Sequence, residues 1–339
     1  MSILNKQMIF ITGASRSGTT MLNRIFGRHT KILGLNELHV FGDLIEPDRM
    51  LDKVEARKQT DLCETILLRE QYNVYHANKK FENEDLLKRI CEKVTADSSA
   101  AEIFMETITA LTEQAKKTIA CEQTPRNIFY AQQILDIYPN AHIVHIVRDP
   151  RSVLASQKSK WRLKFLDGDH IPWLDIIRMW CNYHPITLSK LWMEANRTAS
   201  YLSDHPRVQL IKFEDLLTSP DDVIAKLCTK MGLEFESTML DITHEGSSHQ
   251  INAGEERGIS NSTQANWKKS LSTAEIHLSQ RMCAEGMEYY SYENVENTLS
   301  LVEIALVWFR FPVHIIGVAL FNPRRAKIQL MSLLNKFKT

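Results

Sequence analysis

The sequence predicts an α/β fold of three layers, in which a central parallel sheet is flanked by helices. Short apolar runs alternate with helical segments along the chain, an alternation that is typical of parallel sheets. The chain has 339 residues, of which 44% are hydrophobic and 24% charged, enough for an ordinary globular core. Four apolar runs predict buried strands, at residues 7–12, 117–125, 141–147 and 207–213.

The segments between these strands predict the covering layers. Residues 31–44 predict a short strand and a turn, and the charged stretch 45–118 predicts mostly helix. Amphipathic spacing or capping residues predict the other helices, at 18–28, 127–139, 148–158, 173–202, 219–232 and 272–287. The tryptophans of the middle segment, Trp161, Trp173, Trp180 and Trp192, are expected in the core, with an acceptor cleft as the alternative.

Charge and cysteine usage exclude several classes of protein. Lysine plus arginine and aspartate plus glutamate balance at 41 each, so no basic field favours nucleic acid and any anion site must be local. The 6 cysteines are widely spaced, without a C-x-x-C pair, which argues against a zinc site or disulfide framework and fits a reducing compartment. The N-terminus "MSILNKQMIF" shows no signal peptide and no anchor, so a cytoplasmic protein is expected.

The composition changes near Leu299. An apolar stretch at 299–321, interrupted by Pro312 and two charges, precedes a basic amphipathic end. We therefore expect one domain at 1–296 and an apolar helical tail at 297–339. The length suits a membrane span, but lysine and arginine positions favour membrane-surface contact through 299–338, with a hairpin at Pro312 as one form of it. Packing on the core or on a partner is the other alternative.

The chemical signal begins with "GASRSGTT", residues 13–20, directly after the first strand. A glycine-rich turn between a strand and a helix gathers backbone N–H groups around a tetrahedral anion. The spacing is P-loop-like, but Thr19 stands where nucleotide triphosphatases have their lysine. Arg16 instead offers a planar fork that grips two oxygens, which suits an anion handled without a metal. The alternative is a strand–helix turn with a surface arginine.

A second cation follows the strand at 141–147. Arg148 stands at its carboxyl end, and Ser156 lies about two turns into the next helix. Carboxyl ends of parallel strands converge on one ligand crevice, so both residues are expected to bind a second phosphate of the same ligand. Arg148 could instead pair with Asp149 or Glu214.

Together, "SRSGTT" and "VRDPRSVLAS" resemble the motifs of PAPS-dependent sulfotransferases, the carbohydrate and tyrosylprotein branch, over most of residues 7–290. PAPS is 3′-phosphoadenosine 5′-phosphosulfate. The resemblance implies that one group of residues holds the 5′-phosphosulfate and another the 3′-phosphate. The first group is Arg16, Ser17, Gly18, Thr19 and Thr20, and the second is Arg148, Ser156 and, through the loop "QANWKKSL", Lys268.

The resemblance also points to a base. "GLNELHVFGD" looks like the segment with the family's catalytic glutamate, which makes Glu37 the first candidate, and His39 is the runner-up by intrinsic pKa. On a strand the two side chains would face the same way. In "CEQTPRN" Gln123 replaces a lysine of many relatives, and Arg126 is the candidate substitute for that cation.

We therefore expect sulfuryl transfer from PAPS to a hydroxyl, or an amine, of a carbohydrate, lipid or other small acceptor. One alternative is a P-loop kinase or nucleotide triphosphatase that uses ATP–Mg²⁺, with Asp149 as the metal ligand. The other is a non-catalytic nucleotide-binding module attached to a membrane. Metal-independent binding of the spent cofactor, adenosine 3′,5′-bisphosphate, would exclude the kinase alternative. Measurable turnover would exclude the non-catalytic module.

Overall fold

A computed structural model of the protein describes residues 2–73, 79–159, 173–242, 267–296, 298 and 300–321. The described residues form two compact units. The first contains the chain up to Arg148 and a return segment from Ala195 to Ile242, and the second contains Asp149–Glu194 and the described residues from Trp267 onward. The expected cofactor loop and the expected base belong to the first unit, whereas Ser156 and Lys268 belong to the second.

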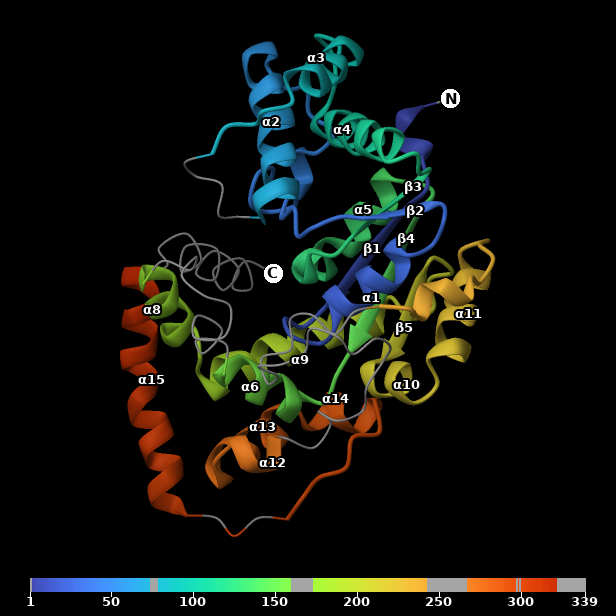
Figure 1. The fold of residues 1–339 in the computed structure, drawn as a ribbon. Coiled ribbons are helices and arrows are strands. Elements are labelled where there is room, and N and C mark those ends of the chain that lie inside the picture. The colour runs from blue at the N-terminus through green and yellow to red at the C-terminus, as the bar shows by residue number, and fades with distance from the viewer. Residues whose placement is uncertain are drawn as a thin grey trace. The chain divides into compact units, whose positions relative to one another are not determined.

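The first unit is built on a parallel five-stranded sheet with the strand order β2-β3-β1-β4-β5 (Figure 1). The strands are β1 (Met8–Gly13), β2 (Ile32–Gly34), β3 (Ile119–Glu122), β4 (Ala141–Val147) and β5 (Val208–Lys212). β1 is central, and its pairing with β4 extends from Met8↔Ala141 to Gly13↔Ile146. The carboxyl ends of β1 and β4 therefore reach the same edge of the sheet, where the glycine-rich loop and Arg148 begin.

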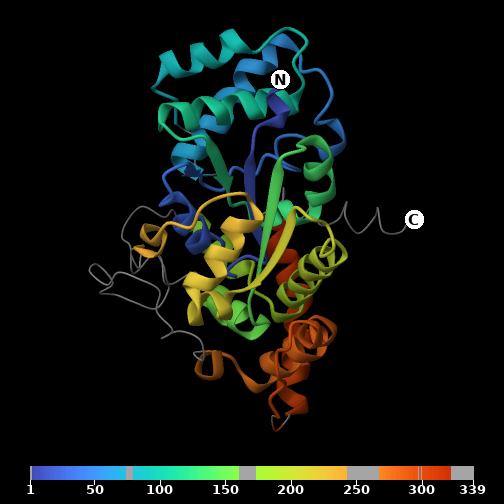
Figure 2. The same ribbon diagram turned by 90° about the vertical axis from the view of Figure 1, so that its right-hand side faces the viewer.

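Alternate residues of β1 face two separate hydrophobic clusters, because successive side chains of a strand point to opposite faces. Met8 and Phe10 pack with residues of α4 and α5, and Ile9 and Ile11 pack with residues of α1, α10 and α11. Figure 2 shows the last two of these helices in yellow beside β5. The helices of this unit are α1 (Thr19–Gly27), α2 (Ala56–Tyr72), α3 (Glu84–Lys93), α4 (Ala100–Gln114), α5 (Ala131–Ile137), α10 (Phe213–Thr218) and α11 (Pro220–Lys230).

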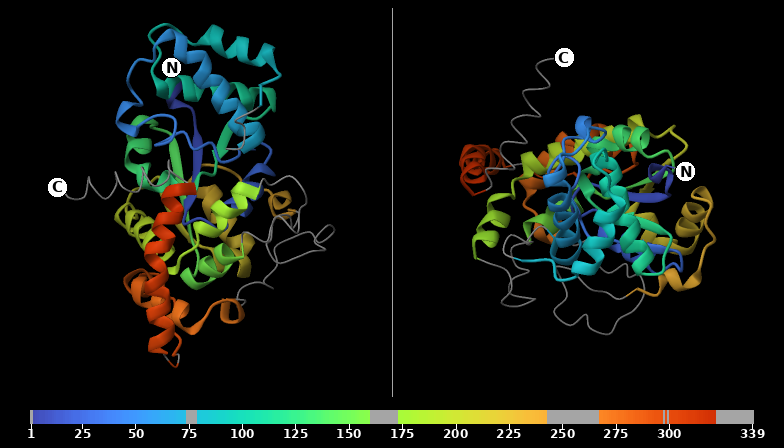
Figure 3. Two further views of the ribbon diagram at one scale, coloured as in Figure 1. Left: turned by 90° about the vertical axis from the view of Figure 1, so that its left-hand side faces the viewer. Right: turned by 90° about the horizontal axis from the view of Figure 1, so that it is seen from above.

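The described part of the second unit is helical. Its elements are α6 (Pro150–Lys158), α8 (Trp173–Cys181), α9 (Pro185–Tyr201, whose last residues belong to the first unit), α12 (Trp267–Ser270), α13 (Thr273–Met282), α14 (Ala284–Tyr289) and α15 (Leu301–Phe321). α6, α9, α12 and α13 share an apolar cluster that contains Leu154, Leu188, Trp267 and Ile276. α15 packs on α8 and α13 (Figure 3).

The three-layer α/β prediction is confirmed, including the apolar helix near the C-terminus. Two predicted helices are divided. The helix expected at 173–202 is two helices, α8 and α9, because Pro185 begins the second and the chain turns at Asn182–His184. The helix expected at 272–287 changes at Cys283 from α13 to α14.

Two further expectations are wrong. α15 continues through Pro312, so the hairpin expected there does not form. Trp180 is 60% exposed, whereas Trp192, at 1%, is in the core as expected. The side chains of Trp161 and Trp173 lie outside the described residues, as does the segment 160–172.

Candidate active site

The loop between β1 and α1 has a backbone that only certain residues tolerate. Gly18 precedes α1 at φ 104°, and a Cβ atom there would collide with the ring of Phe213. Gly13 is equally confined, since a Cβ would lie 2.6 Å from the carbonyl oxygen of Ile146 on the neighbouring strand. Arg16 also has a left-handed backbone, at φ 76°. The loop is therefore shaped by its contacts with β4 and α10.

Arg148 is tied to this loop within the first unit. Its Nη1 donates to the carbonyl oxygen of Arg16 at 3.2 Å, and its guanidinium lies 4.4 Å from the centre of the Phe213 ring. A guanidinium over an aromatic face is held in place by its attraction to the ring. The Phe213 ring thus packs against Gly18 on one side and contacts the Arg148 guanidinium. We call these three residues the Phe213 stack. The structure brings Arg148 to the loop, as the sequence predicted.

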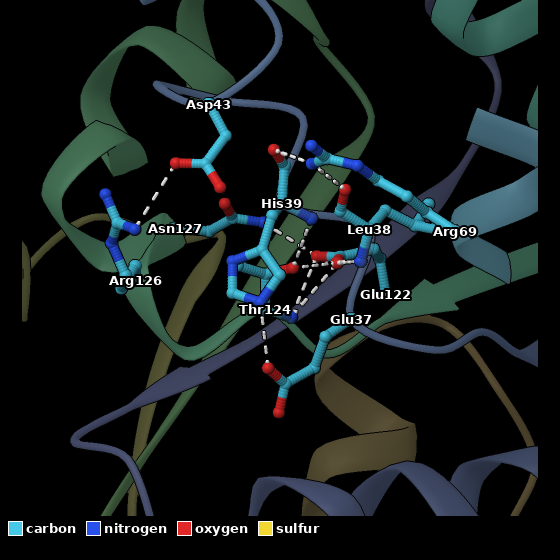
Figure 4. A network of polar contacts seen from close by, with 9 residues as sticks. All are labelled: Glu37, Leu38, His39, Asp43, Arg69, Glu122, Thr124, Arg126 and Asn127. Carbon is cyan, nitrogen blue, oxygen red and sulfur yellow. Dashed lines mark hydrogen bonds and ion pairs between the residues drawn. The ribbon is translucent and has the colours of Figure 1, made fainter. Parts of the chain in front are cut away.

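Glu37 and His39 meet at the end of an irregular segment that follows β2. His39 Nε2 lies 3.0 Å from Glu37 Oε2, and the Glu37 side chain is 37% exposed. The short strand predicted within 31–44 is β2, which ends at Gly34, so the pair lies beyond it, and His39 has a left-handed backbone at φ 47°. The two side chains nevertheless face each other (Figure 4).

Electrostatics link this pair to the loop. Burial lowers the pKa of the Arg16 guanidinium, and the negative charge of Glu37 acts in the opposite direction. Arg16 and Glu37 are thus close enough to sense each other's charge, although they are separated in sequence by α1 and β2. Transfer of an anionic group to a hydroxyl needs a cation for the group and a base for the hydroxyl. Arg16 and Glu37 are residues of these two kinds.

The model of the sulfotransferase family matches residues 8–237, which include the loop, the Glu37–His39 pair and Arg148. The chain belongs to the sulfotransferase family. Carbohydrate sulfotransferase 5 of Mus musculus is 22% identical over 88% of this chain and 84% of its own length. This sulfotransferase is therefore a PAPS-dependent enzyme, and its P-loop-like sheet belongs to the family's fold.

Solved structures support the fold. The sulfotransferase domain from the curacin biosynthetic pathway aligns with 86% of this sulfotransferase and 99% of its own chain, with a TM-score of 0.52 and 19% identity. The sulfotransferase domain of the Synechococcus PCC 7002 olefin synthase aligns with 85% and 96%, with a TM-score of 0.50 and 20% identity.

The segment after β3 contains Arg126, the candidate substitute for the lysine that Gln123 replaces. Arg126 lies in the 3-10 helix Pro125–Tyr130, and its Nη1 is 3.4 Å from Asp43 Oδ1. Arg126 thus already has a carboxylate partner, and its role as the substitute cation stays a prediction. Gln123 is buried, and its Oε1 has no hydrogen-bond partner among the described residues.

Two predicted cofactor residues belong to the second unit. Ser156 is buried in α6, and Lys268 is exposed on α12. Their roles at the 3′-phosphate stay predictions from the family resemblance. Sequence reasoning missed Phe213 as the support of Arg148, and also the buried residues Glu122 and Arg69 beneath the Glu37–His39 segment. No sequence motif marks these three, because each acts across a long separation in the chain.

Proposed function

We propose that this sulfotransferase moves a sulfuryl group from PAPS to a hydroxyl of a carbohydrate or lipid acceptor. The observation that carries the proposal is the contact between Glu37 and His39, with Arg16 within electrostatic reach. A hydroxyl must lose its proton as it attacks, so a carboxylate–imidazole pair beside an anion-binding loop provides the needed base. Glu37 takes the proton, and His39 orients the carboxylate.

The loop fits a phosphosulfate group. Ser17 Oγ is buried and has no partner among the described residues, so it is available to donate to an incoming oxygen. Arg16, Ser17, Gly18, Thr19 and Thr20 hold the 5′ side in this proposal, and Arg148 holds the 3′-phosphate. When bound, PAPS supplies the sulfuryl group and leaves as adenosine 3′,5′-bisphosphate. Arg16 stabilises the negative charge that develops during transfer.

Binding of adenosine 3′,5′-bisphosphate tests the cofactor site. Arg148→Ala is expected to weaken it at least about tenfold, because one charge-assisted hydrogen bond contributes roughly 1.5–3 kcal/mol. Calorimetry in the presence of EDTA measures the affinity, with ATP–Mg²⁺ as the competing ligand. Arg28→Ala is the matched control, since Arg28 is exposed at the other end of α1 and pairs with Asp241. Equal affinities of all three proteins, or a preference for ATP–Mg²⁺, would overturn the assignment.

The acceptor is proposed to be a glycan or a lipid-linked glycan. One support is the similarity to a protein named as a carbohydrate sulfotransferase. The test is transfer of radioactive sulfate from labelled PAPS to oligosaccharides, glycolipids, simple alcohols and amines. Label in the oligosaccharide or glycolipid products supports the proposal, and label confined to alcohols or amines contradicts it.

Membrane contact is proposed through the tail, 297–339, with 1–296 as the catalytic domain. Among the described residues, only α15 has the length and apolarity of a membrane-crossing helix. Within the second unit α15 is held by polar contacts: His184 Nε2 donates to the Val307 carbonyl at 3.2 Å, and Thr187 Oγ1 lies 3.0 Å from His314 Nε2. Such contacts argue against a membrane span, and the basic residues that follow in sequence, Arg324, Arg325 and Lys327, favour contact with a membrane surface. A cytoplasmic location fits this proposal.

Vesicle sedimentation tests this contact. The wild type is expected to sediment with vesicles of phosphatidylcholine and phosphatidylserine, and the double variant Phe309→Glu/Leu320→Glu is expected to stay in solution. Both side chains are exposed on α15, so the changes remove apolar contact without disturbing the core. Tyr201→Glu is the control, because Tyr201 is equally exposed but lies in the first unit. Deletion of 299–338 should also release the protein. Unchanged sedimentation of the double variant and of the deletion variant would refute the proposal.

A further inference from the structure

Side chains bind the backbone of Leu38 and His39, next to Glu37. The N–H groups of Leu38 and His39 donate to Glu122 Oε1 and Thr124 Oγ1, both at 3.0 Å. The carbonyl oxygens of the same two residues accept from Arg69 Nη1, at 2.8 and 2.7 Å. Four consecutive backbone groups that would pair with a neighbouring strand in a sheet are instead bound by the side chains of Arg69, Glu122 and Thr124 (Figure 4).

Glu122 is the acceptor of this arrangement. It is the last residue of β3 and is only 2% exposed. Besides Leu38 it accepts from the Thr124 N–H, from the Thr124 hydroxyl and from Asn127 Nδ2 at 2.7 Å. Burial raises the pKa of Glu122, whereas the hydrogen bonds from Thr124 and Leu38 and the nearby charge of His39 lower it. The net effect is a raised pKa, and the donors from Leu38, Thr124 and Asn127 suit the ionised form of the carboxylate.

Arg69 is the donor of the arrangement. It lies near the end of α2 and is 8% exposed, and a single nitrogen reaches both carbonyl oxygens. Its guanidinium thus binds carbonyl oxygens of the Leu38–His39 backbone, whereas the carboxylate of Glu122 binds an N–H group of the same short segment. A left-handed backbone at a residue such as His39 costs free energy and persists only where its surroundings fix it. The contacts with Arg69 and Thr124 fix it here.

We propose that Arg69 and Glu122 are positioning residues of the sulfotransferase, which hold Glu37 and His39 in the geometry for proton transfer. Neither needs to touch the cofactor or the acceptor, because both act through the backbone between the two functional side chains. Loss of either contact lets the segment relax toward an extended backbone, in which His39 turns and the 3.0 Å contact with Glu37 is broken. The inference rests on the proposed function of Glu37 as the base.

The same helix offers a matched control for Arg69. Gln59, also on α2 and 9% exposed, donates to the carbonyl oxygens of Val54 and Thr95 at 3.1 and 2.9 Å. Both residues thus bind two backbone carbonyls from a buried position, but only Arg69 binds the segment with Glu37. Arg69→Met and Gln59→Met therefore cause the same kind of structural loss, and they differ in which segment is released.

The first measurement is steady-state kinetics with labelled PAPS and the best acceptor of the panel. Arg69→Met is expected to lower kcat about 10- to 100-fold, the effect of misplacing a catalytic group by about 1 Å. The KM for PAPS and the affinity for adenosine 3′,5′-bisphosphate stay unchanged, and Arg69→Lys recovers part of kcat. Gln59→Met keeps the wild-type kcat. Equal kcat values in the two methionine variants would overturn the positioning role.

Glu122 is tested by Glu122→Gln and Glu122→Asp. Glutamine places donor hydrogens against N–H groups and is expected to lower kcat at least tenfold, whereas aspartate retains the charge and recovers part of it. Hydrogen exchange supplies a readout without an acceptor: the Leu38 and His39 amides should exchange faster in Glu122→Gln while the β4 amides stay protected. Unchanged exchange at Leu38 and His39 would refute the inference. A normal kcat in Glu37→Gln would instead refute the proposed base. The exchange result would then still decide whether Glu122 holds the segment.

Discussion

Glu37→Gln is expected to lower kcat at least about 100-fold while the affinity for adenosine 3′,5′-bisphosphate is kept, a loss typical of a general base. Glutamine retains the size of the side chain and its contact with His39, but it cannot accept a proton. Glu37 is also partly exposed, so its replacement leaves the core intact. Single-turnover measurement with labelled PAPS isolates the transfer step from product release. Glu37→Ala should lose at least as much.

His39→Gln separates the two candidates for the base. If Glu37 takes the proton, His39 only orients it, and we expect a loss of about tenfold. A larger loss in His39→Gln than in Glu37→Gln would exchange their roles, and near-normal turnover in both would remove the pair from the reaction. Binding of adenosine 3′,5′-bisphosphate serves as the control in each variant, because neither residue belongs to the proposed cofactor site.

The centre of the sheet was predictable from sequence because β1 and β4 are short apolar runs buried on both faces. The run at 141–147 coincides with β4, and the run at 7–12 with most of β1. A strand covered by helices on both faces needs apolar residues at every position, so it is visible without knowledge of its neighbours. The glycine-rich loop was predictable for a related reason, since its left-handed turn and close approaches require particular residues at fixed spacing.

The conformation of the Glu37–His39 segment was not predictable in this way. Its backbone is set by Arg69, 31 residues from Leu38, and by Glu122, 84 residues from it. Single-sequence reasoning sees β-prone residues around Val40 and Phe41 and favours a strand. The buried charges that override this preference lie on α2 and β3, and only the fold brings them together. The sequence therefore singled out Glu37 and His39, which the structure brings into contact, but not the backbone that presents them.

Two prolines show the same limit in helices. Pro185 begins α9 after a break, and Pro312 lies inside the continuous α15. Both occur in apolar amphipathic stretches, so local sequence treats them alike. In the structure His184, directly before α9, donates to the carbonyl oxygen of Val307, in the turn before Pro312. A proline inside a helix usually kinks or ends it, so tertiary packing decides between the two outcomes.

Gly18→Ala is expected to destabilise the protein by about 3 kcal/mol and to weaken binding of adenosine 3′,5′-bisphosphate at least about tenfold. The left-handed backbone at φ 104° contributes roughly 1–2 kcal/mol of that cost, and the collision of the new Cβ with Phe213 contributes the remainder. The affinity falls because the Phe213 ring carries the guanidinium of Arg148, so a displaced ring displaces the cation. Chemical denaturation and calorimetry measure the two effects.

Gly232→Ala separates backbone strain from the effect on the Phe213 stack. Gly232 is also left-handed, at φ 70°, but a Cβ there meets nothing within 4 Å. Its replacement should therefore cost only the backbone term, roughly 1–2 kcal/mol, with unchanged affinity. If Gly18→Ala loses stability as Gly232→Ala does and still binds the nucleotide normally, the Phe213 stack does not position Arg148. If only Gly18→Ala loses affinity, the glycine-rich loop, the Phe213 ring and the Arg148 guanidinium act as one unit in binding the nucleotide.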